Sequence, residues 1–149
     1  MARIIVAKKK PDIKKPDNQI TRNVGLYFVC YKLSTLGWNV LPTNTKEIDL
    51  LVHKSKGDVS VTKRTIQTKT LSKQSPAPLG ENLDNLFADW FIICQGISPN
   101  ENPKCFILSK KEVLDLKHTG ENDKGEISYW LQKEEYEKKE FEENWERMD

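Results

Sequence analysis

The stretch "KEIDLLVHKSKGDVSVTKRTIQTKTLSK", Lys46 to Lys73, contains the feature that decides the fold. Two apolar runs of strand length flank a connection with Gly57, which predicts a β-hairpin. The first run also carries Asp49, and the second carries Gln67 and Lys69. Because side chains alternate along a strand, both polar sets can lie on one side of the paired strands. The sequence therefore predicts a cluster of one carboxylate, one amide oxygen and one ammonium group.

Apolar patterns on either side of this hairpin predict the rest of an α/β domain. Residues 18–36 have helical apolar spacing, and so many of them are apolar that we expect this helix to pack on more than one side. The other expected elements are strands at residues 37–43, 90–97 and 103–110 and helices at residues 81–89 and 110–118. We therefore expect a central mixed sheet flanked by helices, with the core order α-β-β-β-α-β.

Length and composition favour one domain without a membrane span. The chain has 149 residues, and no apolar run approaches the roughly 20 residues that a spanning helix needs. The four apolar residues after Arg3 are too few for a signal peptide. Cys30, Cys94 and Cys105 have no C-x-x-C spacing and are interpreted as buried thiols of a reducing compartment. We expect a cytoplasmic protein, and the lack of a glycine-rich phosphate loop predicts no nucleotide cofactor.

Charge divides the chain into three parts although the net charge is only +2. Residues 1–17 form a basic arm, residues 18–118 the predicted domain, and residues 119–149 an acidic extension with aromatic residues that we expect to pack on the same domain. A basic stretch follows the first strand of the hairpin and comprises Lys54, Lys56, Lys63, Arg64 and Lys73. Such a stretch is either a solvated surface or a face that binds a polyanion such as DNA.

The combination of these motifs resembles a known family. A helix ending in "STLGWNV", an aspartate in "EIDLLV" and the following "IQTKT" are similar to the PD-(D/E)xK nuclease superfamily, which has the restriction-endonuclease-like fold. The Gln-x-Lys form is similar to that of Mrr-type endonucleases, in which glutamine replaces the second acid. The resemblance covers about residues 18–110. It implies a metal-dependent endonuclease-like phosphodiesterase that acts on DNA.

The resemblance implies a role for each residue of the cluster. Asp49 would bind Mg²⁺ or Mn²⁺ together with the side-chain oxygen of Gln67 and the backbone carbonyl of Thr68. Lys69 would activate the attacking water and stabilise charge on the phosphate. Hard cations prefer oxygen ligands and retain several waters, so few protein ligands suffice. The basic residues Lys54, Lys56, Lys63, Arg64 and Lys73 would contact DNA phosphates.

The sequence departs from the family's pattern at one position, which keeps an alternative open. Many members carry a glutamate on the first helix, whereas residues 18–36 contain no acid. The alternative is a catalytically inactive module of the same fold that binds nucleic acid or a protein partner, or an unrelated α/β interaction domain. Without a metal site, Asp49 would pair with Lys69 or bond a turn, and Gln67 would be an ordinary amide on a half-exposed strand. The unrelated interaction domain instead predicts that Asp49 and Lys69 lie far apart. Pairing of two copies of the chain is also left open.

Several other polar residues are weaker candidates for the same site. Glu47 shares the strand face of Asp49, and Glu81 and Asp84 are more remote acids that could complete a metal site. His53 is either a packing residue or a base. The sequence offers no further recognisable nucleophile–histidine pairing.

Overall fold

The computed structural model describes residues 18–43, 45, 47–57, 60–72 and 75–149. The predicted basic arm, residues 1–17, and the candidate DNA contact Lys73 therefore lie outside the described residues. The elements, in chain order, are α1 (Asn18–Thr35), β1 (Asn39–Pro42), β2 (Leu50–Lys56), β3 (Ser60–Leu71), β4 (Ala77–Gly80), the 3-10 helix η1 (Leu83–Asn85), β5 (Trp90–Gln95), β6 (Lys104–Ser109), α2 (Lys110–Leu116), β7 (His118–Glu121), β8 (Ile127–Leu131), α3 (Lys133–Tyr136) and the 3-10 helix η2 (Trp145–Met148).

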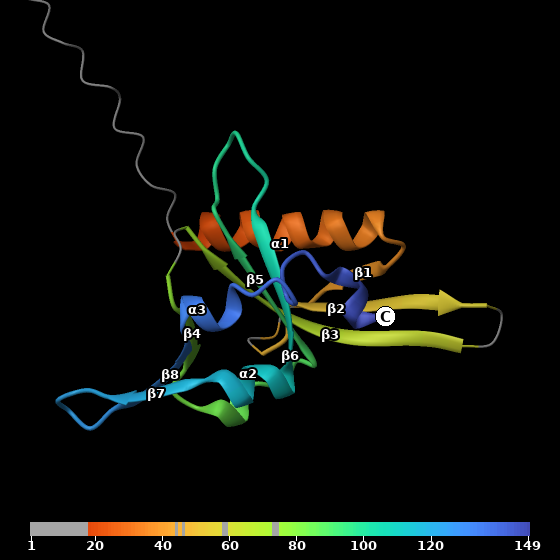
Figure 1. The fold of residues 1–149 in the computed structure, drawn as a ribbon. Helices are drawn as coiled ribbons and strands as arrows, with labels where there is room; N and C mark the ends of the chain where they lie inside the picture. Colours follow the sequence, from red (N-terminus) through yellow and green to blue (C-terminus); the bar gives the residue numbers. More distant parts are fainter. Residues whose placement is uncertain (1–17, 44, 46, 58–59, 73–74) are drawn as a thin grey trace, which may run out of the picture.

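A five-stranded sheet in the order β1-β2-β3-β5-β6 forms the centre of the molecule (Figure 1). β1, β2 and β3 are an antiparallel meander, β5 runs parallel to β3, and β6 returns antiparallel to β5. A second, three-stranded sheet has the order β4-β8-β7. The prediction of an α/β chain with a central mixed sheet and helices is confirmed.

The crossover from β3 to β5 differs from the predicted core order. The crossover contains β4, and residues 81–89, where a helix was predicted, form only a single turn of 3-10 helix, η1. β4 is extended because it pairs with β8, about fifty residues later in the chain. Leu79, Leu86 and Ala88 are buried along the crossover and anchor it to the core. The prediction of a helix over residues 81–89 is therefore wrong beyond the turn η1, and the residues after this turn are non-helical and partly buried in the core.

Helix α1 packs on one face of the main sheet. Val29 and Leu33 are fully buried against β2, β3 and β5, as part of the core cluster that includes Leu50 and Ile66. The opposite side of the helix exposes apolar residues, namely Ile20, Val24, Tyr27 and Tyr31. The expectation that α1 packs on more than one side is thus wrong within the described part of the chain.

One glycine sets how closely α1 approaches β3. A Cβ atom added to Gly25 would lie 2.0 Å from Thr70 Oγ1 and 2.7 Å from Thr70 Cγ2. Only a residue without a side chain therefore permits this contact. The close approach brings the first turns of α1 against the C-terminal half of β3.

The two faces of the main sheet have separate cores. On the α1 face, β5 and β6 contribute Ile92, Cys94, Cys105 and Ile107. On the other face, the alternating residues Phe91, Ile93, Phe106 and Leu108 pack with β4, β8, α2 and α3. Cys94 and Cys105 lie directly opposite each other with Sγ atoms 3.2 Å apart, whereas Cys30 is only half-buried. Among the described residues, no helix is long and apolar enough to cross a membrane.

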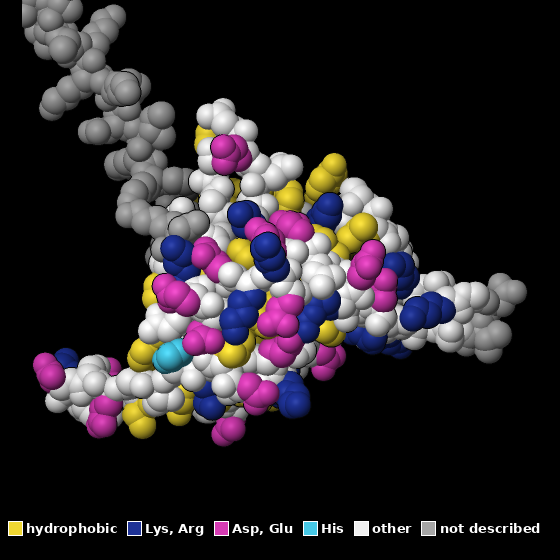
Figure 2. Space-filling model, in the orientation of Figure 1, with side chains coloured by type: hydrophobic (Ala, Val, Ile, Leu, Met, Phe, Trp, Pro, Cys, Tyr) yellow, Lys and Arg dark blue, Asp and Glu magenta, His cyan; other side chains and the backbone are white. Residues whose placement is uncertain are grey.

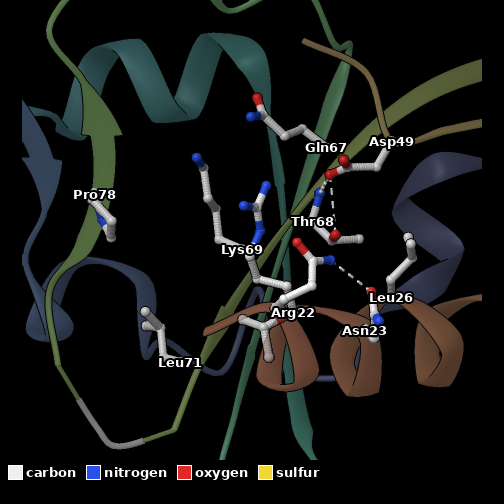
Figure 3. Close-up of a pocket in the computed structure, with 11 residues that line it drawn as sticks. Arg22, Asn23, Leu26, Asp49, Gln67, Thr68, Lys69, Leu71 and Pro78 are labelled. Atoms are coloured by element: carbon white, nitrogen blue, oxygen red, sulfur yellow. Dashed lines mark hydrogen bonds between the residues drawn. The ribbon is translucent and has the colours of Figure 1, made fainter. Parts of the chain in front are cut away.

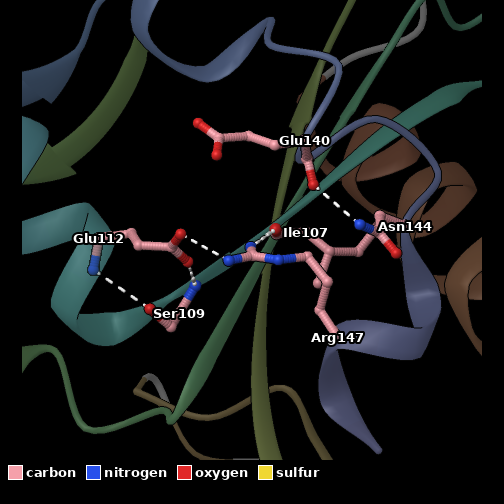
Figure 4. A network of polar contacts seen from close by, with 6 residues as sticks. All are labelled: Ile107, Ser109, Glu112, Glu140, Asn144 and Arg147. Atoms are coloured by element: carbon pink, nitrogen blue, oxygen red, sulfur yellow. Dashed lines mark hydrogen bonds and ion pairs between the residues drawn. The ribbon is translucent and has the colours of Figure 1, made fainter.

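The C-terminal segment closes over the end of the α1-side core through Arg147 (Figure 4). The guanidinium donates to Ile107 O at 2.6 Å and to Glu112 Oε2 at 2.5 Å, and lies over the rings of Trp90 and Phe141. Glu112 also accepts from the backbone of Ser109 and so caps α2. Burial raises the pKa of Glu112, but hydrogen bonds from Arg147 and Ser109 outweigh it and lower the pKa below its ordinary value.

Candidate active site

A pocket of about 380 Å³ lies between the first turns of α1 and the ends of β2 and β3 (Figure 3). The predicted site residues Asp49, Gln67, Thr68 and Lys69 all line it. α1 forms one wall through Gln19, Arg22, Asn23 and Leu26, while Thr70, Leu71 and the β4 residue Pro78 complete the lining. Residues from both strands of the predicted hairpin motif therefore line one pocket.

Asp49 is held in place by the backbone at the point where β2 and β3 separate. Its N–H donates to Ile66 O at 2.9 Å, next to the last paired residues, Leu50 and Ile66. Beyond them, Asp49 Oδ2 accepts from the Thr68 N–H at 2.7 Å and from Thr68 Oγ1 at 3.1 Å. The Asp49 carboxylate thus takes the place of a β2 backbone carbonyl as the acceptor for β3, just beyond the last paired residues. Its second oxygen, Oδ1, accepts no hydrogen bond from the residues that the structure describes.

The Thr68 carbonyl faces the same edge of β3 as the Asp49 carboxylate. The N–H and C=O of one strand residue point to the same neighbouring strand. Because the Thr68 N–H points to Asp49, the Thr68 carbonyl lies on that side too. Asp49 Oδ1 and this carbonyl are therefore two oxygens at one end of the pocket.

Gln67 and Lys69 project from β3 on the face away from α1. Ile66, the residue before Gln67, packs on the α1 side, and side chains alternate along a strand. Gln67 Oε1 is buried and has no hydrogen-bond partner among the described residues. In Figure 3 its amide end points away from the Asp49 carboxylate. An unpaired buried acceptor is unfavourable, so this oxygen is a free ligand atom at the rim of the cluster.

Lys69 is a partly desolvated cation. Burial lowers the pKa of its ammonium group below the ordinary value; the Asp49 carboxylate opposes this shift, and the Arg22 guanidinium adds to it. Within the described residues, the Lys69 ammonium has no hydrogen bond or ion pair within 4.0 Å. The predicted direct salt bridge between Asp49 and Lys69 is therefore absent, although the two residues interact electrostatically.

Arg22 is the pocket residue that the sequence reasoning missed. It belongs to the first turns of α1, and its exposed guanidinium forms no ion pair or hydrogen bond with the described residues. A signal for it was present in the sequence. Leu26, Val29 and Leu33 follow Arg22 at helical spacing on one face, so a single cation begins the stripe that packs on the sheet.

The donor atoms of the pocket fit a hard divalent cation that retains most of its waters. The available atoms are all oxygens: Asp49 Oδ1, the Thr68 carbonyl and the unpartnered Gln67 Oε1. Only one of them carries charge, and the described residues contain no group of three His, Cys, Asp or Glu side chains that could hold a metal. The other candidate acids, Glu47, Glu81 and Asp84, do not line the pocket. A cation would therefore bind weakly without substrate.

The four predicted DNA-contacting residues that the structure describes are divided between the two faces of the hairpin, and none of these four lines the pocket. Lys54 pairs with Asp149 at 3.3 Å and lies over the Trp38 ring. Arg64 donates to Met148 O at 2.8 Å. Lys63 and Lys56 are exposed. Two of the four described basic residues therefore bind the C-terminal segment, and Figure 2 shows cations and carboxylates interspersed on the face it presents.

The histidines lie outside the pocket. His53 is half-buried in β2 opposite Lys63. His118 stacks on Trp130, and its Nε2 lies 3.7 Å from Glu135.

No family model, curated protein or solved structure matches the chain. The chemistry of the pocket is thus the basis for a function.

Proposed function

We propose that the chain is a metal-dependent phosphodiesterase that acts on DNA. The observation that carries the proposal is the meeting of Asp49, Thr68 and Lys69 at one pocket, which is lined by both a free carboxylate oxygen and a partly desolvated ammonium group. The finer part of the proposal is a fold related to the PD-(D/E)xK nucleases. Its support is the helix, the three-stranded meander and the parallel fourth strand, in that order.

The residues divide the chemical work. Mg²⁺ or Mn²⁺ held by Asp49 and the Thr68 carbonyl, with Gln67 as a further ligand once its amide turns toward Asp49, would supply Lewis-acid stabilisation of the phosphoryl oxygens. Thr68 fixes the carboxylate orientation through two hydrogen bonds. The Lys69 ammonium neutralises charge that develops on the phosphate, and its partial burial strengthens that interaction. The lowered pKa also makes proton transfer between Lys69 and water easier.

Cleavage assays test this proposal. Plasmid, linear and branched DNA are incubated with the protein and Mg²⁺ or Mn²⁺, and nicks are counted on gels. Cleavage is expected for the unmodified chain and for Lys124→Ala, which removes an exposed lysine in the β7–β8 turn. It should fall at least about a hundredfold in Asp49→Ala. Repeated absence of cleavage on every substrate with both metals would refute the proposal.

The second candidate function is a module of this kind that binds DNA or a protein without cutting. Two observations favour it: α1 contains no acid, and Asp49 Oδ2 already accepts two hydrogen bonds. It predicts salt-sensitive DNA binding that needs no metal and survives Asp49→Ala. Metal-dependent cleavage that requires Asp49 excludes it. Cutting both strands of a duplex would need two sites, so a second copy of the chain is a proposed partner of the active form.

A further inference from the structure

We infer that Arg22 and Lys69 form a phosphate anchor that holds the DNA backbone in the pocket without any metal. The inference rests on the proposed function for the identity of its ligand, a nucleic-acid phosphodiester. It goes further by assigning a binding role to a cation on α1, the helix that carries an acid in many nucleases of the proposed class.

The charges in the pocket are unbalanced. Of the described residues that line it, only Arg22, Lys69 and Asp49 are ionisable, so two cations face one carboxylate there. One oxygen of that carboxylate is already engaged by Thr68. Arg22 also acts on Lys69 by like-charge repulsion, as the pKa of Lys69 shows. An anion bound between these two cations would relieve their repulsion and compensate the partly desolvated ammonium group of Lys69.

In the part of the chain that the structure describes, the surroundings of Arg22 offer no partner for its charge. Its neighbours one turn away on α1 are Gln19, Gly25 and Leu26, none of which is acidic. The Gln19 amide donates to Asn23 Oδ1 at 3.0 Å, so these two side chains satisfy each other and leave the guanidinium free. Gly25 holds this part of the helix against Thr70, which keeps Arg22 at the pocket wall. The cation is thus placed by packing while its charge remains available.

The two cations suit a phosphodiester in complementary ways. A guanidinium presents a planar fork of N–H donors that matches two phosphate oxygens, whereas an ammonium group acts as a point charge. Apolar side chains of Leu26, Leu71 and Pro78 line the remaining walls, where the sugar next to the phosphate could pack. The volume of about 380 Å³ is within the range of small-molecule sites.

A cation on this wall also limits how many metals the pocket can hold. A second divalent cation beside Arg22 would meet like charge and no additional carboxylate. The anchor therefore recruits the phosphate first. A single metal at Asp49 would act on a substrate that is already bound.

Fluorescence anisotropy with a single-stranded oligonucleotide tests the anchor in EDTA, over a series of salt concentrations. Arg22→Ala should weaken binding about tenfold and reduce the slope of log affinity against log salt by about 0.7, the value for one phosphate contact. Lys69→Ala should act similarly, Arg22→Lys should lose less, and Lys124→Ala should match the unmodified chain. Melting temperatures check that each variant is folded. Binding and slope unchanged in Arg22→Ala, or no binding in EDTA, would overturn the inference.

Further arms identify the ligand and separate this inference from the proposed function. Oligonucleotides with and without a 5′-phosphate should bind equally if the backbone is the ligand. Displacement by millimolar inorganic phosphate at equal ionic strength would instead identify free phosphate and overturn the assignment to DNA. Binding that depends on Arg22 without any cleavage would uphold the anchor and refute the nuclease. Cleavage that is indifferent to Arg22 would do the reverse.

Discussion

Two arginines near opposite ends of the chain differ in how many partners the fold gives them. Arg147 is enclosed by a carboxylate, a backbone carbonyl and two aromatic rings. Arg22 is held at a pocket wall with no partner among the described residues. The first arginine uses its donors for stability, whereas the second keeps them for a ligand. Arg147 thus contributes to the stability of the fold, whereas we propose a binding role for Arg22. Substitutions near Arg147 should therefore lower stability, and substitutions in the pocket should lower DNA binding or cleavage.

Lys69→Met should give the largest effect, and on activity rather than on stability. It removes the ammonium group that faces the phosphate, so we expect cleavage to fall about a hundredfold or more. The free energy of unfolding should stay the same or rise, because a desolvated cation and its repulsion with Arg22 are lost. Cleavage rates and urea unfolding measure the two quantities. A marked loss of stability would mean that Lys69 is structural and would break the contrast.

Arg147→Ala should lower stability and leave DNA binding unchanged. The change leaves Glu112 and the Ile107 carbonyl without their donor and removes two ring contacts. We expect a loss of about 2 kcal/mol in the free energy of unfolding, reduced from the buried-pair value because the side chains are partly exposed. DNA binding by the folded variant should be unchanged. Arg147→Lys is the matched control and should lose less, since it keeps the charge without the fork.

Gly25→Ala should lower both stability and DNA binding, because Gly25 permits the close packing of α1 on β3 that places Arg22 at the pocket. The new Cβ would overlap the Thr70 side chain, so the helix or Thr70 must shift. We expect about 1–2 kcal/mol lower stability, which is the cost of overpacking less the better helix propensity of alanine. DNA binding should weaken as Arg22 moves. The double variant Gly25→Ala/Thr70→Ala should recover part of both losses; identical behaviour of the single and double variants would contradict the overlap.

The smallest effect should be the pH dependence contributed by Glu112. Its folded-state pKa is lowered, so its contribution to stability is present above the unfolded-state pKa and is lost as the pH falls through the folded-state value. Partial exposure should keep this contribution below about 1 kcal/mol. Glu112→Gln should flatten the acid side of the stability curve measured by thermal unfolding. An unchanged acid slope would show that the carboxylate is not coupled to folding.

Sequence patterns predicted the parts of the site that depend on local geometry. Alternation along the hairpin places Gln67 and Lys69 on one side of β3. Asp49 joins their pocket differently, because it lies beyond the last paired residues of β2 and accepts from Thr68 instead of sharing a face with them. Arg22 could not be placed in the same way, because its position depends on how α1 packs on β3 through Gly25. The internal partners of Lys54 and Arg64 come from the last residues of the chain, so their loss as free DNA contacts could not be read from the hairpin alone.

The same limit explains the missing second helix of the core. The segment at residues 81–89 has a sequence that favours a short helix, but β4 just before it is extended by pairing with β8. Asn82 accepts from the Asp84 N–H and starts the helical turn, which ends after Asn85. Leu86 and Ala88 then enter the core without regular secondary structure. Burial of these apolar side chains thus replaces continuation of the helical turn here.

The hydrogen bond from the Thr68 amide to Asp49 makes one backbone proton a spectroscopic reporter of the pocket. Most strand amides donate to a neighbouring carbonyl, whereas this one donates to a carboxylate at 2.7 Å. Its NMR resonance should respond whenever the charge on Asp49 changes, as when a cation binds Oδ1. The side-chain Nε resonance of Arg22 would report on a phosphate instead. Two signals in one spectrum can therefore tell which ligand arrives first.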